Sequence, residues 1–147
     1  MTRLALKYYW ILLFAKRKHI KEDKEILTLK KEANAYWCSS WIISIRKTKQ
    51  GTFLAVLQGD DLEDTQGNTE REVPAEFVND ILSSLATATI VPFPKMRMGN
   101  DGCFVTLEVG DYTGKASYRW WTRAPDTWKP LATVANKIKG LFPETLL

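Results

Sequence analysis

The sequence predicts an α+β protein in which a single-layer antiparallel sheet of about five strands carries two helices packed on one face. Three observations lead to this fold class. Several short segments alternate apolar and polar residues, which is typical of half-buried strands. Two longer segments instead repeat apolar residues at the three- and four-residue spacing of a helix. Their order is strands, helix, strands, helix, which favours antiparallel hairpins over alternating parallel units.

The strand segments are separated by turn signals. Leu27 and Leu29 lie on one face of the first segment, opposite Ile26, Thr28 and Lys30. The second segment has Trp37, Trp41, Ile43 and Ile45 on one face. A turn at residues 48–51 connects the second strand to the third, and the Gly99–Gly102 stretch is a turn before the fourth. The expected strands are Glu25–Lys31, Trp37–Lys47, Thr52–Gln58, Cys103–Val109 and Ala116–Thr122.

Two helices are expected, and a polar stretch precedes the first. Residues 60–72 are rich in charge and are predicted to form an exposed loop. Pro74 suits the first turn of a helix over residues 74–88, and Asp126 is placed to cap a second helix over residues 127–140. The apolar stripes of the two helices are Phe77, Val78, Ile81, Leu82 and Leu85, and Trp128, Leu131, Val134, Ala135 and Ile138. Residues 90–98 should be extended because each proline disfavours the α region for the residue before it.

The last hairpin contains adjacent tryptophans that must point to opposite faces of a strand. Pairing Val105 with Trp120 gives a consistent apolar face, whereas a slip of one residue would oppose Val105 to a charged residue. Trp120 is therefore predicted to lie in the core, with Trp121 on the other face beside Phe104. The outward Trp121 either reinforces the sheet, lies beneath the apolar N-terminal segment, or belongs to a binding patch with Arg119 and Arg123.

Length and charge indicate one domain with a polarised surface. The 147 residues are 45% hydrophobic and 26% charged, which excludes disorder along the whole chain and fits a single domain over residues 1–147. The net charge of +4 is uneven, because residues 1–59 hold 12 Lys and Arg against four Asp and Glu. Residues 1–20 are a candidate peripheral arm, apolar from Leu4 to Ala15 and basic after it. This segment is too short to span a bilayer as a helix, and it would serve as core, membrane anchor or interface.

The residues needed for catalysis or for a bound metal are sparse. His19 is the only histidine, and neither Cys38 nor Cys103 belongs to a metal-ligand or C-x-x-C pattern. Two cysteines without such a pattern fit a reducing cytoplasm, and we expect them to be unbonded. Residues 62–73, with Gly67 in the sixth position, do not fit a calcium loop because Leu62 and Val73 occupy its first and twelfth positions, and Glu22–Lys24 carries only part of a nuclease pattern. No catalytic residue, metal or cofactor is therefore expected.

These observations favour a small non-enzymatic domain that binds another protein. The layout is similar to several small bacterial domains of unknown function, and a bacterial inhibitor or immunity-type protein is one form of this hypothesis. The alternatives are a membrane-associated domain, through Leu4 to Ala15, and a less favoured nucleic-acid binder. The candidate partner-binding residues are Asp60, Asp61, Glu63, Asp64, Phe104, Arg119, Trp121 and Arg123.

Overall fold

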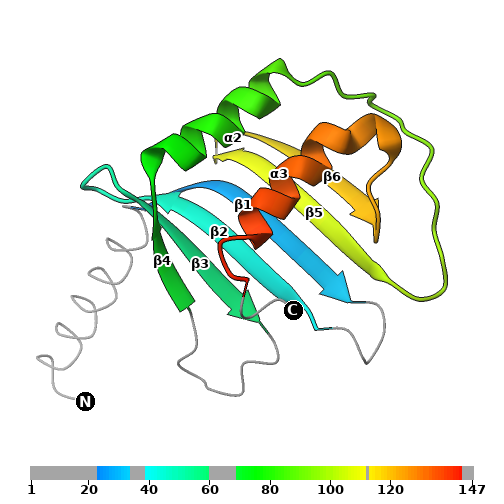
Figure 1. The fold of residues 1–147 in the computed structure, drawn as a ribbon, viewed down its shortest axis with the longest axis horizontal. Helices are drawn as coiled ribbons and strands as arrows, with labels where there is room; N and C mark the ends of the chain where they lie inside the picture. Colours follow the sequence, from blue (N-terminus) through cyan, green and yellow to red (C-terminus); the bar gives the residue numbers. More distant parts are fainter. Residues whose placement is uncertain (1–22, 34–38, 60–68, 112, 144–147) are drawn as a thin grey trace, which may run out of the picture.

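The computed structural model describes residues 23–33, 39–59, 69–111 and 113–143, and within them it has one antiparallel sheet of six strands with two α-helices. The strand order is β4-β3-β2-β1-β5-β6, and both helices lie on the same face of the sheet (Figure 1). The elements are β1 (Lys24–Ala33), β2 (Trp41–Lys47), β3 (Phe53–Gly59), β4 (Thr69–Val73), α2 (Ala75–Thr87), β5 (Cys103–Asp111), β6 (Gly114–Trp121), the short 3-10 helix η1 (Asp126–Trp128) and α3 (Lys129–Lys139). The predicted fold class is confirmed, with one strand more than expected.

The core lies between the sheet and the two helices. Strand register aligns Leu29 with Ile43 and Ile43 with Leu57, and all three side chains are fully buried. The helices contribute the stripes expected of them, with Ile81 of α2 and Ile138 of α3 among the fully buried residues. Alternation in the strands and helical spacing in α2 and α3 therefore converge on one apolar layer.

The sixth strand was missed because its sequence resembles a polar loop. Residues 69–72 were expected to continue the loop, but Thr69–Val73 pairs antiparallel with β3 at the edge of the sheet. Val73 is buried, and Arg71 donates a hydrogen bond of 2.7 Å to the carbonyl oxygen of Leu141 beyond α3. The charged residues of this edge strand are tolerated because its outer edge faces solvent. Their charges also disfavour pairing with a strand of another chain.

The β5–β6 hairpin has the predicted register. Val109 pairs with Ala116 and Val105 with Trp120, so the apolar faces of the two strands coincide. Gly110 adopts φ +117°, and a Cβ atom there would overlap the carbonyl oxygen of Gly114 on the opposite strand. The hairpin end therefore requires glycine at position 110, because only glycine combines that φ with such a close backbone approach.

The chain leaves the sheet immediately after Trp121. Thr122 has φ 45°, and its backbone N–H donates to the carbonyl oxygen of Cys103 at 2.7 Å. The prediction that Asp126 caps α3 is wrong, because Asp126 begins η1, Trp128 stands at the N-cap position, and no side chain caps either helix. Pro130 lies in the first turn of α3, as expected. None of the helices in the described ranges is long and apolar enough to cross a membrane.

Candidate partner-binding face of the sheet

The two adjacent tryptophans occupy opposite faces of β6. Trp120 pairs with Val105, is 3% exposed and packs in the core with its ring centroid 6.4 Å from that of Trp128. Trp121 pairs with Phe104 on the other face, where the two rings meet edge to face with centroids 4.8 Å apart. The prediction that placed Trp120 in the core and Trp121 beside Phe104 is confirmed.

Of the three alternatives for Trp121, the exposed binding patch does not fit, because Trp121 is only 6% exposed. The backbone that precedes β5 lies against the indole. A Cβ atom on Gly102 would stand 3.0 Å from the Trp121 ring, and one on Gly99 would stand 3.5 Å from its Nε1. These glycines had been interpreted only as turn residues, and their lack of a side chain is what allows the chain to cover the ring. The N-terminal segment Leu4 to Ala15, considered as a cover, lies outside the described residues.

Arg119 extends the Trp121–Phe104 contact towards solvent. Its guanidinium lies 4.0 Å from the centroid of the Phe104 ring, and it forms an ion pair of 3.2 Å with Glu32 on β1. The Arg119 and Glu32 side chains are both more than half exposed. The cation–π contact contributes about 0.5–1 kcal/mol at such an exposed site. The cluster therefore exposes the Arg119 guanidinium and the Glu32 carboxylate to solvent, and the rings of Phe104 and Trp121 pack beneath them.

Arg123 does not join this cluster. Alternation would place it on the face of Trp121, but β6 ends before it and the positive φ of Thr122 redirects the chain. Arg123 instead lies in solvent, 3.7 Å from Asp126. The structure therefore brings together three of the predicted site residues, Phe104, Arg119 and Trp121. The four acidic candidates, Asp60, Asp61, Glu63 and Asp64, lie outside the described residues.

Paired charges occupy the middle of the same face. The Glu108 carboxylate accepts a hydrogen bond of 2.9 Å from Lys115 and lies 3.4 Å from Lys30. The hydrogen bond from Lys115 is the main reason why the pKa of Glu108 is lowered, and the field of Lys30 adds to it. The same bond raises the pKa of Lys115. Glu108 is thus held as a carboxylate between two cations rather than as a proton donor.

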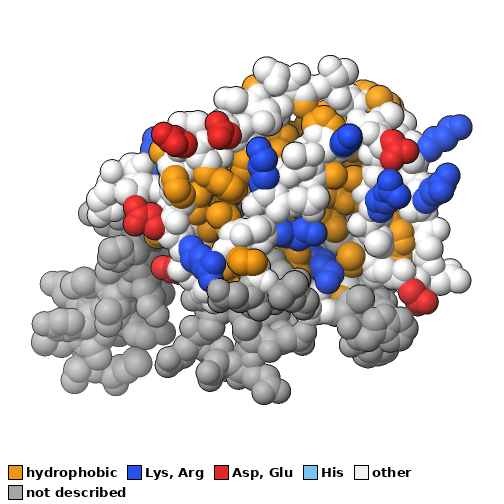
Figure 2. Space-filling view, in the orientation of Figure 1, with side chains coloured by type: hydrophobic (Ala, Val, Ile, Leu, Met, Phe, Trp, Pro, Cys, Tyr) orange, Lys and Arg blue, Asp and Glu red, His pale blue; other side chains and the backbone are white. Residues whose placement is uncertain are grey.

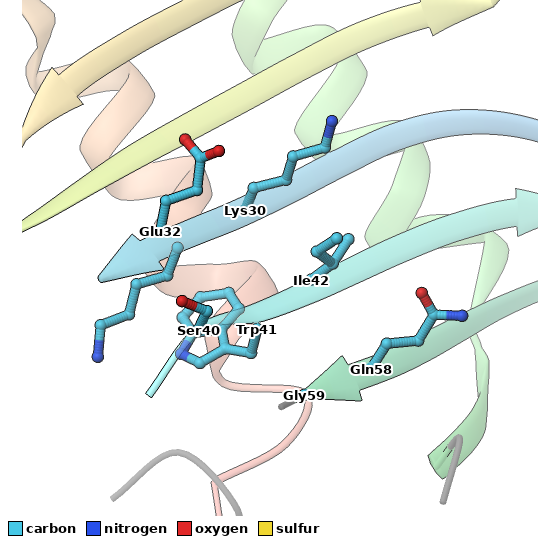
Figure 3. A pocket seen from close by; sticks show the side chains of 8 residues that line it. Lys30, Glu32, Ser40, Trp41, Ile42, Gln58 and Gly59 are labelled. Atoms are coloured by element: carbon cyan, nitrogen blue, oxygen red, sulfur yellow. The ribbon is translucent and has the colours of Figure 1, made fainter. Parts of the chain in front are cut away.

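A pocket of about 270 Å³ lies next to the Arg119–Glu32 ion pair, and Glu32 is one of the residues that line it. Its lining residues come from β1, β2 and β3 and from the residue before β2, and in Figure 3 the helices lie behind these strands. Its lining offers hydrocarbon from Ile42, an amide from Gln58 and charged groups from Lys30 and Glu32. The sequence reasoning overlooked Ile42, although an apolar residue at a polar position of a strand pattern was a usable signal.

The pocket and the aromatic cluster lie on the same face of the sheet. Register places Arg119 opposite Thr106, Thr106 opposite Lys30, Lys30 opposite Ile42, and Ile42 opposite Gln58. This row crosses five strands. The binding face is defined from here on by six residues on or beside it, Lys30, Glu32, Ile42, Gln58, Phe104 and Arg119.

The fold and this face define an α+β protein in which two helices cover one side of a sheet and the other side presents mixed apolar and charged groups. No protein-family model matches the chain, and no curated protein sequence matches it. Within the described ranges no group of three or more His, Cys, Asp or Glu is placed to hold a metal ion.

Proposed function

We propose that this protein is a non-enzymatic binding domain that contacts a protein partner through the binding face. The observation that carries the proposal is the row from Arg119 to Gln58, whose register places a held arginine and a pocket lined in part by Ile42 on the same face of the sheet. Both parts are needed for specific recognition, since apolar contact supplies affinity and oriented polar groups supply selectivity.

The support for a protein partner comes from the chemistry of the exposed groups. Arginine and aromatic residues are enriched at the energetic centres of protein interfaces. The Phe104 ring holds the Arg119 guanidinium against the sheet, which reduces the side-chain entropy lost when a partner carboxylate or carbonyl binds. The pocket beside Ile42 suits one apolar or amide side chain of that partner. Because the groups project from β-strands, their positions are held by the sheet.

The proposal is tested by partner capture with matched charge reversals. Arg119→Glu changes the binding face, whereas Lys137→Glu makes the same charge change on the exposed side of α3. Wild type and both variants are used as bait in extract from the source organism, and captured proteins are quantified by mass spectrometry. A partner that is retained by Lys137→Glu and lost by Arg119→Glu supports the proposal.

A second substitution tests the pocket, since Ile42→Asp introduces a charge against its apolar wall. The same partner should be lost, with the unfolding midpoint of the variant measured to confirm that it is folded. Loss of the partner by Lys137→Glu, with both face variants unaffected, would place the interface elsewhere and overturn the assignment of this face.

The inhibitor or immunity role remains a prediction within this proposal. It requires that the captured partner be an enzyme or toxin whose activity falls when the wild-type protein is added and is preserved with Arg119→Glu. The acidic residues Asp60, Asp61, Glu63 and Asp64 are a predicted contact for a basic partner. Replacing them with Asn or Gln should slow association, with an effect that shrinks as salt rises.

A further inference from the structure

An exposed apolar segment connects α2 to β5 and is not used by the binding face. Val91, Phe93, Met96 and Met98 are the large hydrophobic side chains most open to solvent in the described part of the chain, and Phe93 is 93% exposed. The segment is the long green-to-yellow connection at the right of Figure 1. Residues 91–98 are called the tip from here on. Isolated exposed apolar residues are common on proteins, but four within eight residues of one connection need a physical account.

The tip is fastened at both ends. The indole N–H of Trp128 donates a hydrogen bond of 2.8 Å to the carbonyl oxygen of Val91. At the other end, the backbone at Gly99 and Gly102 lies against the ring of Trp121. These two contacts fix where the segment leaves and rejoins the body of the protein, and the residues between them project outward.

Two prolines hold Phe93 in this position. Pro92 and Pro94 each have a restricted φ, and Pro94 also disfavours the α region for Phe93. The chain bends at Pro92 and Phe93, and the restricted φ of both prolines limits the conformations that could bring the ring back to the core. An apolar ring held out in solvent by its neighbours is arranged for a contact outside the chain.

Basic residues accompany the apolar side chains of the tip. Lys95 and Arg97 alternate with Met96 and Met98, and all four are exposed. Arg123 and Lys129 are also exposed, and they follow the two fastening residues in sequence, Lys129 directly after Trp128 and Arg123 two residues after Trp121. Figure 2 shows Lys and Arg side chains gathered at the right-hand end of the molecule, where this connection runs. Two acidic residues also belong to these segments of the sequence, Asp101 and Asp126, and Asp126 lies 3.7 Å from Arg123.

We propose that the tip docks this protein on an anionic membrane surface, with Phe93, Met96 and Met98 entering the headgroup boundary and Lys95 and Arg97 contacting lipid phosphates. A projecting apolar element ringed by cations matches such a surface, because the ring gains an apolar environment while the cations meet negative charge. A second copy of the chain would bring the same cations together, so self-association through the tip is disfavoured. The contact is peripheral and involves no membrane span.

The magnitude of the effect follows from the same groups. Each basic residue near an anionic surface raises membrane affinity about fivefold, so reversing two charges should lower it by well over tenfold. Loss of the Phe93 ring removes most of the inserted apolar area and should lower affinity by about tenfold or more. Both effects require anionic lipid, and the electrostatic part should weaken as salt rises.

The test is sedimentation of the full chain with vesicles of two compositions. One contains phosphatidylcholine alone and the other contains one part phosphatidylserine to two parts phosphatidylcholine. Wild type is expected to bind the mixed vesicles and to remain unbound with phosphatidylcholine alone. Phe93→Ser and the double variant Lys95→Glu with Arg97→Glu should lose binding, whereas Phe93→Leu should retain most of it. Lys137→Glu with Lys139→Glu is the matched control on α3 and should reduce binding much less than the tip reversal.

One further variant and one stability measurement keep the result decisive. Trp10→Ser with Leu12→Ser alters the apolar N-terminal segment while leaving the tip intact, and it should bind vesicles as wild type does. Because the Phe93 side chain is exposed, Phe93→Ser should unfold at the wild-type midpoint, so its loss of binding cannot come from misfolding. Absence of vesicle binding by wild type, or loss through the Trp10 variant with Phe93→Ser unaffected, overturns the proposal. Loss of a protein partner by Phe93→Ser, with vesicle binding unchanged, would assign the tip to that partner and overturn it equally.

Discussion

Replacing Trp121 with alanine tests how the face opposite the helices is built. A tryptophan buries about 150–250 Å², and at about 25 cal/mol per Å² this area corresponds to about 4–6 kcal/mol. Substitutions of this kind in buried sites cost about 3–5 kcal/mol. Because Trp121 is 6% exposed, it belongs in this range, although it lies outside the main core.

The lower end of that range is expected for Trp121→Ala, at about 3 kcal/mol. The ring lies on an edge strand and is covered by the backbone at Gly99 and Gly102, which is free to move inwards and fill part of the space. Trp120→Ala removes a ring packed between the sheet and η1, where less collapse is available, and should cost about 4–5 kcal/mol. The comparison between the two variants therefore measures how well each site relaxes.

The assay is urea unfolding of the full chain followed by circular dichroism, with the slope of each transition compared with wild type. A double-mutant cycle with Phe104→Ala should give a coupling energy of about 0.5–1.5 kcal/mol for the edge-to-face pair. Trp121→Phe provides a milder variant should the alanine variant fail to fold. A cost below about 1 kcal/mol for Trp121→Ala is typical of a surface position, and it would refute the claim that the segment before β5 covers the ring.

Three other measurements follow from the structure. Gly110→Ala should destabilise the fold by more than about 2 kcal/mol because the new Cβ overlaps the opposite strand; Gly51→Ala, also at positive φ but in open space, should cost only about 1 kcal/mol. Equal costs would contradict the overlap. The hydrogen bond from Lys115 lowers the pKa of Glu108 in the folded protein. The stability that this bond contributes is therefore fully present above pH 4.5, the ordinary carboxyl pKa, and is lost as the pH falls through the lower pKa of the folded state. Glu108→Gln should therefore be less stable than wild type at neutral pH and approach it in acid, and a gap that persists in strong acid would count against this cause. Cys103 carries a free thiol, so alkylation under denaturing, non-reducing conditions should modify both cysteines, and an unchanged mass would show a disulfide.

The sequence by itself determined the parts of the fold that local patterns encode. Leu27 and Leu29 lie on one face of a strand pattern, and Ile81 and Ile138 lie on helical stripes, so each element has one face that must be buried. The hairpin register also followed, because a one-residue slip would place Arg119 opposite Val105. On the binding face, the same register correctly predicted the contact between Trp121 and Phe104.

Tertiary structure decided the features that depend on residues distant in sequence. Thr69–Val73 reads as a loop, and it becomes a strand because β3 offers a free edge and Val73 can reach the core. Trp121 became buried through the path of the segment before β5, which alternation within β6 cannot specify. The exposure of Phe93 likewise depends on the fastening of its segment by Trp128. A local pattern shows which face of an element must be buried, but the segment that buries it is determined by the tertiary packing of residues distant in sequence.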